Sequence, residues 1–147
     1  MNIYKKEFAV ILAAWTLILM TACSQETIIP QEALPLEITT YISTHFPDYS
    51  ILQSVKDRDD FVLTYDIILS DGISLEFNRK NEIIDIDGHS KLPDSVIPEK
   101  ILLYVKTNYP SSIITDWELD DRNQQVQLDN GLDIEFTMSG DFVRIDD

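Results

Sequence analysis

The sequence predicts an α+β fold made of a tandem repeat, in which each copy is one helix followed by a four-stranded antiparallel sheet. Equivalent residues recur 59 positions apart, and a repeat of that length indicates one supersecondary unit used twice. This spacing joins Gly72 to Gly131, Phe77 to Phe136, and Asp87 to Asp146. In each copy the apolar residues first follow helical spacing and then alternate with a period of two. These observations predict two successive α-β-β-β-β units.

Residues 1–22 are typical of a secretion signal and stand outside the expected fold. Lys5 and Lys6 precede an uncharged run that is too short for a transmembrane helix and suits the core of a signal peptide. Small residues precede Cys23, as in a bacterial lipobox. We therefore expect Cys23 to be lipidated and to anchor the chain in the cell envelope, on the periplasmic or surface side of the outer membrane. A plain signal peptide that happens to contain a cysteine is the alternative.

The expected mature chain is strongly acidic, with nine basic and 25 acidic residues. This charge argues against a nucleic acid ligand, because nucleic acid phosphates would be repelled. It also disfavours docking on anionic lipid, so the lipid on Cys23 is the expected membrane attachment. With Cys23 lipidated no disulfide can form, and the fold must depend on its core.

The expected elements follow one another in the same order in both copies. Residues 23–33 show no periodicity and are expected to form a tether, so that the first copy spans 34–88 and the second spans 89–147. Each copy begins with a helix that a proline ends. These helices are Leu36 to Phe46, before Pro47, and Ile97 to Tyr109, before Pro110.

Strands are expected after each helix, because apolar and polar residues alternate there. The clearest runs are residues 61–69, 73–77, 113–119 and 132–136. Since alternate residues of a strand point to opposite faces, one face takes the helix and the other is rich in acids. Trp117 falls on the helix-facing register and is expected in the core.

The two glycine hairpins are expected to have three-residue loops, Ser70–Gly72 and Asp129–Gly131. A two-residue loop would set the inward Leu69 opposite the outward Ser74, which a period of two forbids. A three-residue loop pairs Leu69 with Ile73, and both are inward. We expect each loop to be a type I turn with its glycine at positive φ.

The sequence carries no recognisable catalytic set. His45 falls on the apolar stripe of the first helix and is expected to be a hydrogen-bonded core residue, whereas His89 is expected to be solvated. No serine elbow, glycine-rich phosphate loop or Cys/His cluster is present. The acidic runs at 57–60 and 116–121 do not match an EF-hand loop and are expected to be solvated. We therefore expect a protein that is not an enzyme and that has no cofactor and no metal site.

The acid-rich face is the candidate partner-binding surface. The carboxylates on the register opposite the helix-facing residues are Asp66, Glu76, Asp85, Asp116, Glu118, Asp133 and Glu135. Near the C-terminus, Val143 and Ile145 look inward, which leaves Phe142 and Arg144 outward. An aromatic residue beside an arginine is typical of an interface anchor. A register slip or bulge would instead place Phe142 in the core.

The motifs, taken together, resemble those of the PepSY-like lipoprotein family of Bacteroides and relatives. They are Leu34-Pro35, Phe46-Pro47, Asp71-Gly72, Glu76-Phe77 and Ile86-Asp87, and then Leu92-Pro93, Tyr109-Pro110, Asn130-Gly131, Glu135-Phe136 and Ile145-Asp146. The resemblance covers residues 34–147 and implies one curved sheet with both helices on one face, as in the beta-lactamase inhibitory protein. It also implies binding or inhibition of other proteins, including peptidases, outside the cytoplasm. The matching positions are all fold residues, so no inhibitory residue carries over.

Two functions therefore remain open. The first is a lipid-anchored, non-catalytic envelope protein that holds a protein partner, such as an envelope enzyme or peptidase, on its acidic face. The second is an envelope protein that binds a small cationic ligand or calcium through the same face.

Overall fold

The computed structural model describes residues 25–59, 62–120 and 122–146. The expected signal peptide and Cys23 lie outside these residues, so cleavage and lipidation stay predictions. None of the helices in the described ranges is long and apolar enough to cross a bilayer.

The strands of the described chain form a single open sheet, in which every strand is antiparallel to its neighbours in the sequence. The strands are β1 (Gln25–Ile28), β2 (Ile51–Asp59), β3 (Val62–Leu69), β4 (Ser74–Phe77), β5 (Ile83–Asp87), β6 (Ile114–Leu119), β7 (Asn123–Leu128), β8 (Asp133–Thr137) and β9 (Phe142–Asp146). The helices are α1 (Leu36–His45) and α2 (Glu99–Asn108), with short 3-10 turns η1 (Gln31–Ala33), η2 (Ser70–Gly72) and η3 (Asp94–Val96). The fold is therefore α+β, as predicted.

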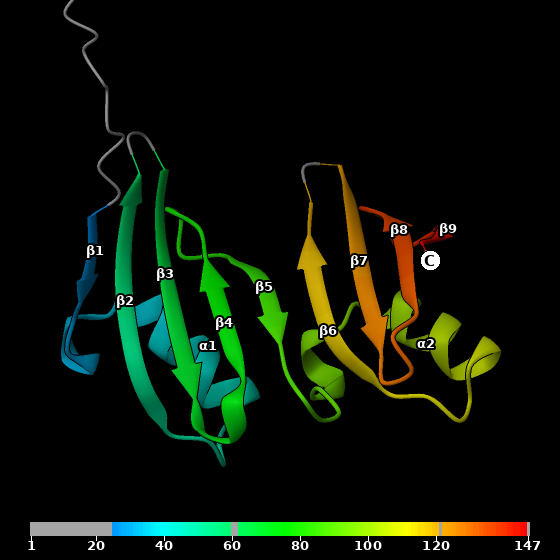
Figure 1. The fold of residues 1–147 in the computed structure, drawn as a ribbon, viewed down its shortest axis with the longest axis horizontal. Helices are drawn as coiled ribbons and strands as arrows, with labels where there is room; N and C mark the ends of the chain where they lie inside the picture. The colour runs from blue at the N-terminus through cyan, green and yellow to red at the C-terminus, as the bar shows by residue number, and fades with distance from the viewer. Residues whose placement is uncertain (1–24, 60–61, 121, 147) are drawn as a thin grey trace, which may run out of the picture.

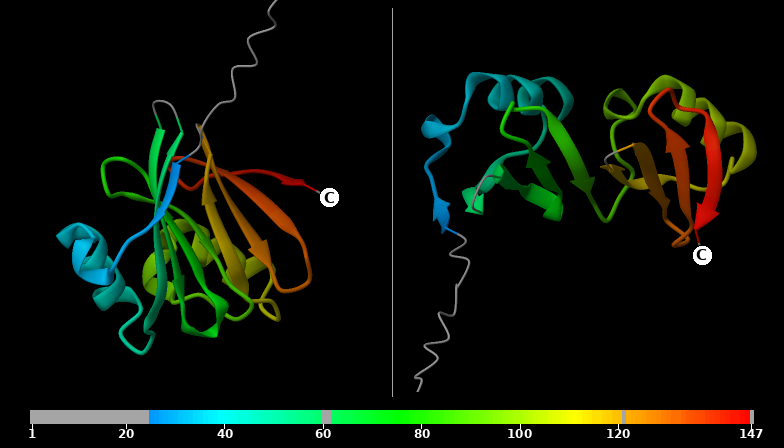
Figure 2. Two further views of the ribbon diagram at one scale, coloured as in Figure 1. Left: turned by 60° about the vertical axis from the view of Figure 1, so that its left-hand side comes forward. Right: turned by 90° about the horizontal axis from the view of Figure 1, so that it is seen from above.

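Both helices lie on the same side of the sheet (Figure 1 and Figure 2, right). Each buries its apolar stripe against the strands, with Ile38 and Ile42 buried in α1 and Ile101 and Val105 buried in α2. The residues buried beneath α1 and those buried beneath α2 belong to one continuous hydrophobic core. No helix of the described residues lies on the opposite side of the sheet, and we call that side the open face.

Aromatic pairs join each helix to the sheet in the same way. Tyr41 of α1 lies edge-on to Phe77 of β4, with ring centroids 5.5 Å apart. Tyr104 of α2 lies edge-on to Phe136 of β8, with centroids 5.2 Å apart. Edge-to-face rings at these distances are favourable beyond the apolar area that they bury.

The segment expected to be a tether contains strand β1 and turn η1. Thr27 of β1 pairs with Lys56 of β2, and Ile28 pairs with Val55. Only four residues form this edge strand, and such a short run gives no periodic signal in the sequence. Its existence depends on the free edge of β2, which supplies the hydrogen-bonding partner.

Both glycine hairpins have the predicted three-residue loops. The amide of Leu69 donates to the carbonyl of Ile73 over 2.8 Å, and the equivalent bond from Leu128 to Leu132 is 2.9 Å. Gly72 and Gly131 have φ of 73° and 80°. The first loop differs from the predicted type I turn, because Asp71 is itself left-handed with φ of 63°. Aspartate tolerates this conformation better than most side chains.

Candidate binding face

A row of directly opposed carboxylates crosses the middle of the open face. Asp66 of β3 faces Glu76 of β4, Glu76 faces Asp85 of β5, and Asp85 faces Glu118 of β6. We call these four residues the first acidic row. Their sequence neighbours Ile67, Leu75, Ile86 and Trp117 are buried on the helix side. The predicted assignment of these four acids to one face is therefore confirmed.

A second row runs beside the first. Asp87 of β5 faces Asp116 of β6, and these two residues are the second acidic row. Ser74 and Gln127 continue it on the flanking strands. Sequence reasoning missed Asp87 because it counted this residue only as part of a closing Ile-Asp motif. The alternation of β5 was the signal that could have placed it on the open face.

Electrostatic repulsion and partial burial both act on these carboxyl groups. Like charges directly opposite in a sheet destabilise it. Burial, followed by repulsion from Glu118, Glu76 and Asp87, raises the pKa of Asp85 to about 6. Burial and neighbouring carboxylates likewise raise the pKa of Asp116 to about 7. Burial first and repulsion second also raise the pKa values of Asp66 and Glu76.

The acids of the last strands have partners of their own. Arg144 of β9 forms ion pairs with Glu135 and Asp146. Hydrogen bonds from Arg144 and Asn123 hold the pKa of Glu135 below its usual value. Asp133 accepts a hydrogen bond of 2.9 Å from the side chain of Gln127. Glu135 and Asp133 thus lie on the predicted face, but the charge of Glu135 is paired with Arg144, unlike the carboxylates of the two acidic rows.

The structure corrects the outward placement of Phe142. A register shift between Glu135 and Phe136 interrupts the pairing of β8 with β9, and it sets Phe142 opposite the buried Phe136. The ring of Phe142 stacks on Tyr104 of α2 with centroids 5.1 Å apart. Phe142 therefore lies on the helix side, while Arg144 pairs with Glu135 on the open face. These two residues do not form a joint anchor.

The two histidines and Trp117, which were also considered from the sequence, can now be placed in the fold. His45 is partly buried, its Nδ1 lies 2.9 Å from the hydroxyl of Ser95, and its ring packs on Tyr41. Trp117 is buried and its indole donates to Gln124 over 3.1 Å. The core assignment of Trp117 is confirmed, whereas His45 is partly buried and hydrogen-bonded as expected but lies outside the buried core. His89 is exposed.

A hollow of about 350 Å³ lies where β4 ends, next to the first acidic row. Val62 and Ile84 give it apolar walls, and Glu76 is the member of the row that lines it. Arg79 and Lys80, from the turn between β4 and β5, form its rim. The hollow can therefore take an apolar side chain beside a charged surface.

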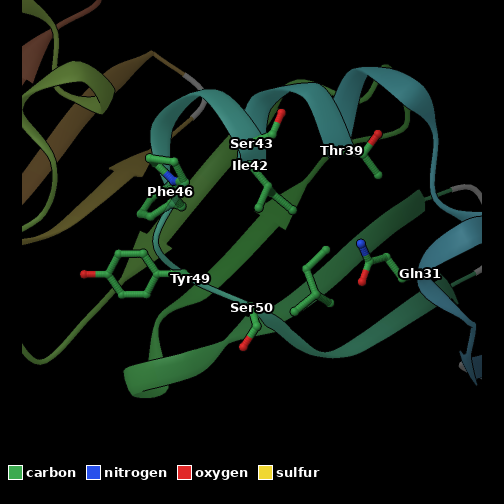
Figure 3. A pocket seen from close by; sticks show the side chains of 9 residues that line it. Gln31, Thr39, Ile42, Ser43, Phe46, Tyr49 and Ser50 are labelled. Carbon is green, nitrogen blue, oxygen red and sulfur yellow. The ribbon is translucent and has the colours of Figure 1, made fainter.

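A second hollow of about 350 Å³ lies between α1 and the start of β2 (Figure 3). Ile42 and Phe46 line it together with several hydroxyl groups. The hydroxyls of Thr39 and Ser43 donate to carbonyls of their own helix over 3.0 Å. These two hydroxyls are therefore already bonded within the helix.

The acidic runs do not assemble a metal centre in the described chain. Among the described residues, no group of three or more His, Cys, Asp or Glu side chains has an arrangement that could hold a metal ion. Asp60 and Asp121, which belong to the two acidic runs, lie outside the described residues.

Family models and solved structures relate this arrangement to known proteins. Two segments, residues 13–64 and 63–144, match the family provisionally described as beta-lactamase-inhibitor-like, PepSY-like. Together they span well over half of the chain. The chain belongs to this family. No curated protein matches it.

Three solved Bacteroides structures resemble the PepSY-like chain over most of its length. A protein of Bacteroides vulgatus, provisionally described as periplasmic and of the DUF2874 family, is 34% identical with a TM-score of 0.79, covering 84% of this chain and 98% of its own. A second B. vulgatus protein, provisionally described as periplasmic and of unknown function, is 30% identical with a TM-score of 0.78, covering 84% and 100%. A Bacteroides thetaiotaomicron protein, provisionally described as calcium-regulated and periplasmic, is 27% identical with a TM-score of 0.79, covering 83% and 97%.

Proposed function

We propose that this PepSY-like chain is a non-catalytic envelope protein that holds a cationic protein partner on its open face. The observation that carries the proposal is the pair of acidic rows on β3 to β6. Opposed carboxylates cost stability in a sheet, and no cation is among the groups that shift the pKa of Asp85 or Asp116. A cationic partner would neutralise these carboxylates by forming ion pairs with them.

The charge of the face and the neighbouring hollow would have different roles in binding. The summed negative potential would mainly speed the encounter with a basic surface. Exposed charges alone give little affinity, because salt and water screen them. An apolar side chain of the partner, inserted between Val62 and Ile84, would supply the desolvated anchor that Phe142 does not provide.

The location of the protein is part of the same proposal. All three solved neighbours reported above are described as periplasmic, and the N-terminal sequence is typical of a bacterial lipoprotein. Lipidation at Cys23 would keep the module at an envelope membrane, where partners such as a peptidase or another envelope enzyme would meet it. Inhibition of that partner is the form of binding that the description of the family favours.

The proposal also treats the two halves as copies of one unit. Each helix is followed by four strands, and the 59-residue spacing places Asn81 and Gly140 at equivalent turns. Both residues are left-handed, with φ of 64° and 79°. Duplication would explain how one sheet came to present two similar halves side by side, with the acidic rows meeting where they join.

Calcium is a second candidate ligand, because one neighbour is described as calcium-regulated. Calcium sites in proteins need several oxygens that converge on one point. The described residues contain no such cluster, so the broad cationic surface of a protein fits the open face better. Calcium therefore enters the test as a competitor.

The test is capture of partners from an envelope extract. The bait would be the wild-type protein or the variant Asp116→Asn/Glu118→Gln, which removes one charge from each row. The matched control is Asp48→Asn/Asp71→Asn, which removes two exposed carboxylates from loops. We expect the same protein to be captured by wild type and control and to be lost from the row variant.

Repeating the capture with calcium or with the calcium chelator EGTA separates the two candidates. Capture that needs no calcium supports direct binding of the partner. Capture of one set of proteins by all three baits would contradict a role for the open face, and a requirement for calcium would favour the second candidate.

A further inference from the structure

The two halves of the sheet meet at the pairing of β5 with β6. Only three residue pairs form this contact: Asp85 with Glu118, Ile86 with Trp117, and Asp87 with Asp116. The other neighbouring strands of the described sheet pair through four or more residues each. The junction therefore has the fewest paired residues of any strand contact in the described sheet. Figure 1 shows β5 and β6 side by side near the middle of the molecule.

The junction is attractive on one face and repulsive on the other. On the helix side Ile86 and Trp117 are buried together, and the His45 ring of α1 bonds Ser95 of η3 over 2.9 Å. On the open face both remaining pairs set carboxylate against carboxylate. Opposed side chains in a sheet have Cβ atoms about 5 Å apart, where like charges repel.

Backbone hydrogen bonds join the two halves beyond the three residue pairs. The amide of Gly88 donates to the carbonyl of Thr115 over 3.0 Å, and that of Leu92 donates to Ile114 over 2.9 Å. Leu92 and Ile114 are both buried in the common core. The two halves are thus joined by backbone bonds in the plane of the sheet and by a buried apolar contact on the helix side, about which the open face could widen or narrow.

We infer that the β5–β6 pairing is a hinge, and that the charge of the two acidic rows holds the open face apart until a cation neutralises it. Repulsion between the carboxylates of β5 and β6 acts only on the open face, so it pushes the two halves apart on that side. Neutral rows would not exert this force. The halves would then rotate toward each other around the packed pair of Ile86 and Trp117.

The charged groups that face the junction all carry the same sign. Asp85 is acted on by Glu76 of β4, by Glu118 of β6 and by Asp87 on its own strand. Asp116 is acted on by Asp85 and Asp87 of β5, by Glu118 on its own strand and by Asp133 of β8. On β7 the facing residues, Gln125 and Gln127, are neutral.

Protons can therefore replace the partner as the neutralising cation in an experiment. The raised pKa values of Asp85 and Asp116, about 6 and about 7, place their protonation between pH 8 and pH 5. We expect the open face to narrow as the pH falls through this window. The link to partner binding rests on the proposed function, and it is reciprocal: closure would favour the partner, and the partner would favour closure.

The experiment measures the distance across the open face by pulsed electron paramagnetic resonance. Spin labels replace Gln53 of β2 and Gln127 of β7, which are exposed, neutral and in the same row as Ser74 and Asp116. Five strand spacings separate them, about 24 Å. A Cys23→Ser background removes the single native thiol. We expect a shorter mean distance at pH 5 than at pH 8.

Two variants decide whether the acidic rows cause the change. Asp85→Asn/Asp116→Asn should have the shorter distance at both pH values, whereas Asp48→Asn/Asp71→Asn should keep the wild-type response. A wild-type distance that does not change with pH, or a response that survives in Asp85→Asn/Asp116→Asn, would overturn the hinge. The measurement needs no partner, so a clear pH response together with failed capture from envelope extracts would support the hinge and reject only the proposed function.

Discussion

Gly131 shows how a single residue limits the hairpin in which it lies. Its φ is 80°, and no atom lies within 4 Å of the position that a Cβ would occupy. Any effect of a substitution there comes from the backbone and not from a clash. We expect Gly131→Val to lower the free energy of unfolding by roughly 1–3 kcal/mol, because a β-branched residue is strained at positive φ.

Urea denaturation of three variants checks this expectation. Gly131→Asn should lose less stability, since asparagine tolerates the left-handed region. Gly72→Val should behave like Gly131→Val, because its φ is 73° and the nearest atom of His89 is 3.5 Å from the added Cβ. Unchanged midpoints for both valine variants would contradict a need for glycine at these turns.

Asp116 links the acidic rows to the pH dependence of stability. Its pKa of about 7 in the folded protein exceeds the ordinary value of 3.8, so the folded state binds the proton more tightly than the unfolded chain. The stability contributed by this group is therefore greatest below about pH 4 and is lost as the pH rises through 7. We expect Asp116→Asn to be more stable than wild type at pH 8 by about 1 kcal/mol, allowing for solvent screening.

Chemical unfolding at two pH values tests this sign. The gain should be largely lost by about pH 4, where the wild-type carboxyl is protonated in the folded state, and absent at still lower pH, where it is protonated in both states. Asp48→Asn should show no comparable gain at pH 8, because Asp48 lies in an exposed loop. A loss of stability for Asp116→Asn at pH 8 would show that the charge of Asp116 is compensated.

Phe142, expected on the open face as a partner anchor, instead packs its ring on the helix side. Its ring is stacked on Tyr104 at an angle of 7° between planes, although 43% of the residue is exposed. We expect Phe142→Ala to lower the unfolding free energy by about 1 kcal/mol through the lost ring contact. The same variant should capture partners from envelope extracts as well as wild type. Lost capture by a variant with unchanged stability would return Phe142 to the binding surface.

At the scale of elements, periodic segments were predictable and edge strands were not. The helices and the glycine hairpins follow from local patterns, because each must bury one stripe or one face of residues. Strand β1 has only four residues and forms on the edge of β2. Strand β9 keeps Arg144 on the open face, yet the bulge opposite Phe136 turns Phe142 to the other side. Both features depend on how the strand pairs with its neighbour: β1 with β2, which is distant in the sequence, and β9 with β8 through a bulge that the alternation of residues does not reveal.

At the scale of the whole molecule, β1 limits how far the sheet can stand from a lipid on Cys23. Gln25 begins this strand, so the two Cα atoms are at most about 7 Å apart even in a fully extended chain. We expect Cys23→Ala to release the protein from the membrane fraction into the soluble envelope fraction. Fractionation followed by immunoblotting measures this release, and a variant that still sediments with membranes would contradict lipidation.

The overall charge predicts how salt should affect binding. The negative potential of the open face extends over the Debye length, about 8 Å at physiological salt. We expect added salt to slow association with the captured partner and to change dissociation much less. Stopped-flow or surface binding kinetics measure both rates. Association that is independent of salt would move the binding surface away from the acidic rows.

Local patterns in the sequence establish which residues alternate, where helices end and which hairpins need glycine, because these properties arise from neighbours within one segment. The sequence placed Asp66, Glu76, Asp85 and Glu118 on one face, since a period of two assigns each side chain of a strand to a side. The three-residue loop after Leu69 also implies that Asp66 faces Glu76. That Asp85 faces both Glu76 and Glu118 is visible only in the folded protein. The register of β4 with β5 includes a bulge, and the register of β5 with β6 is set by the packing of the common core, so a run of alternating residues does not contain that information.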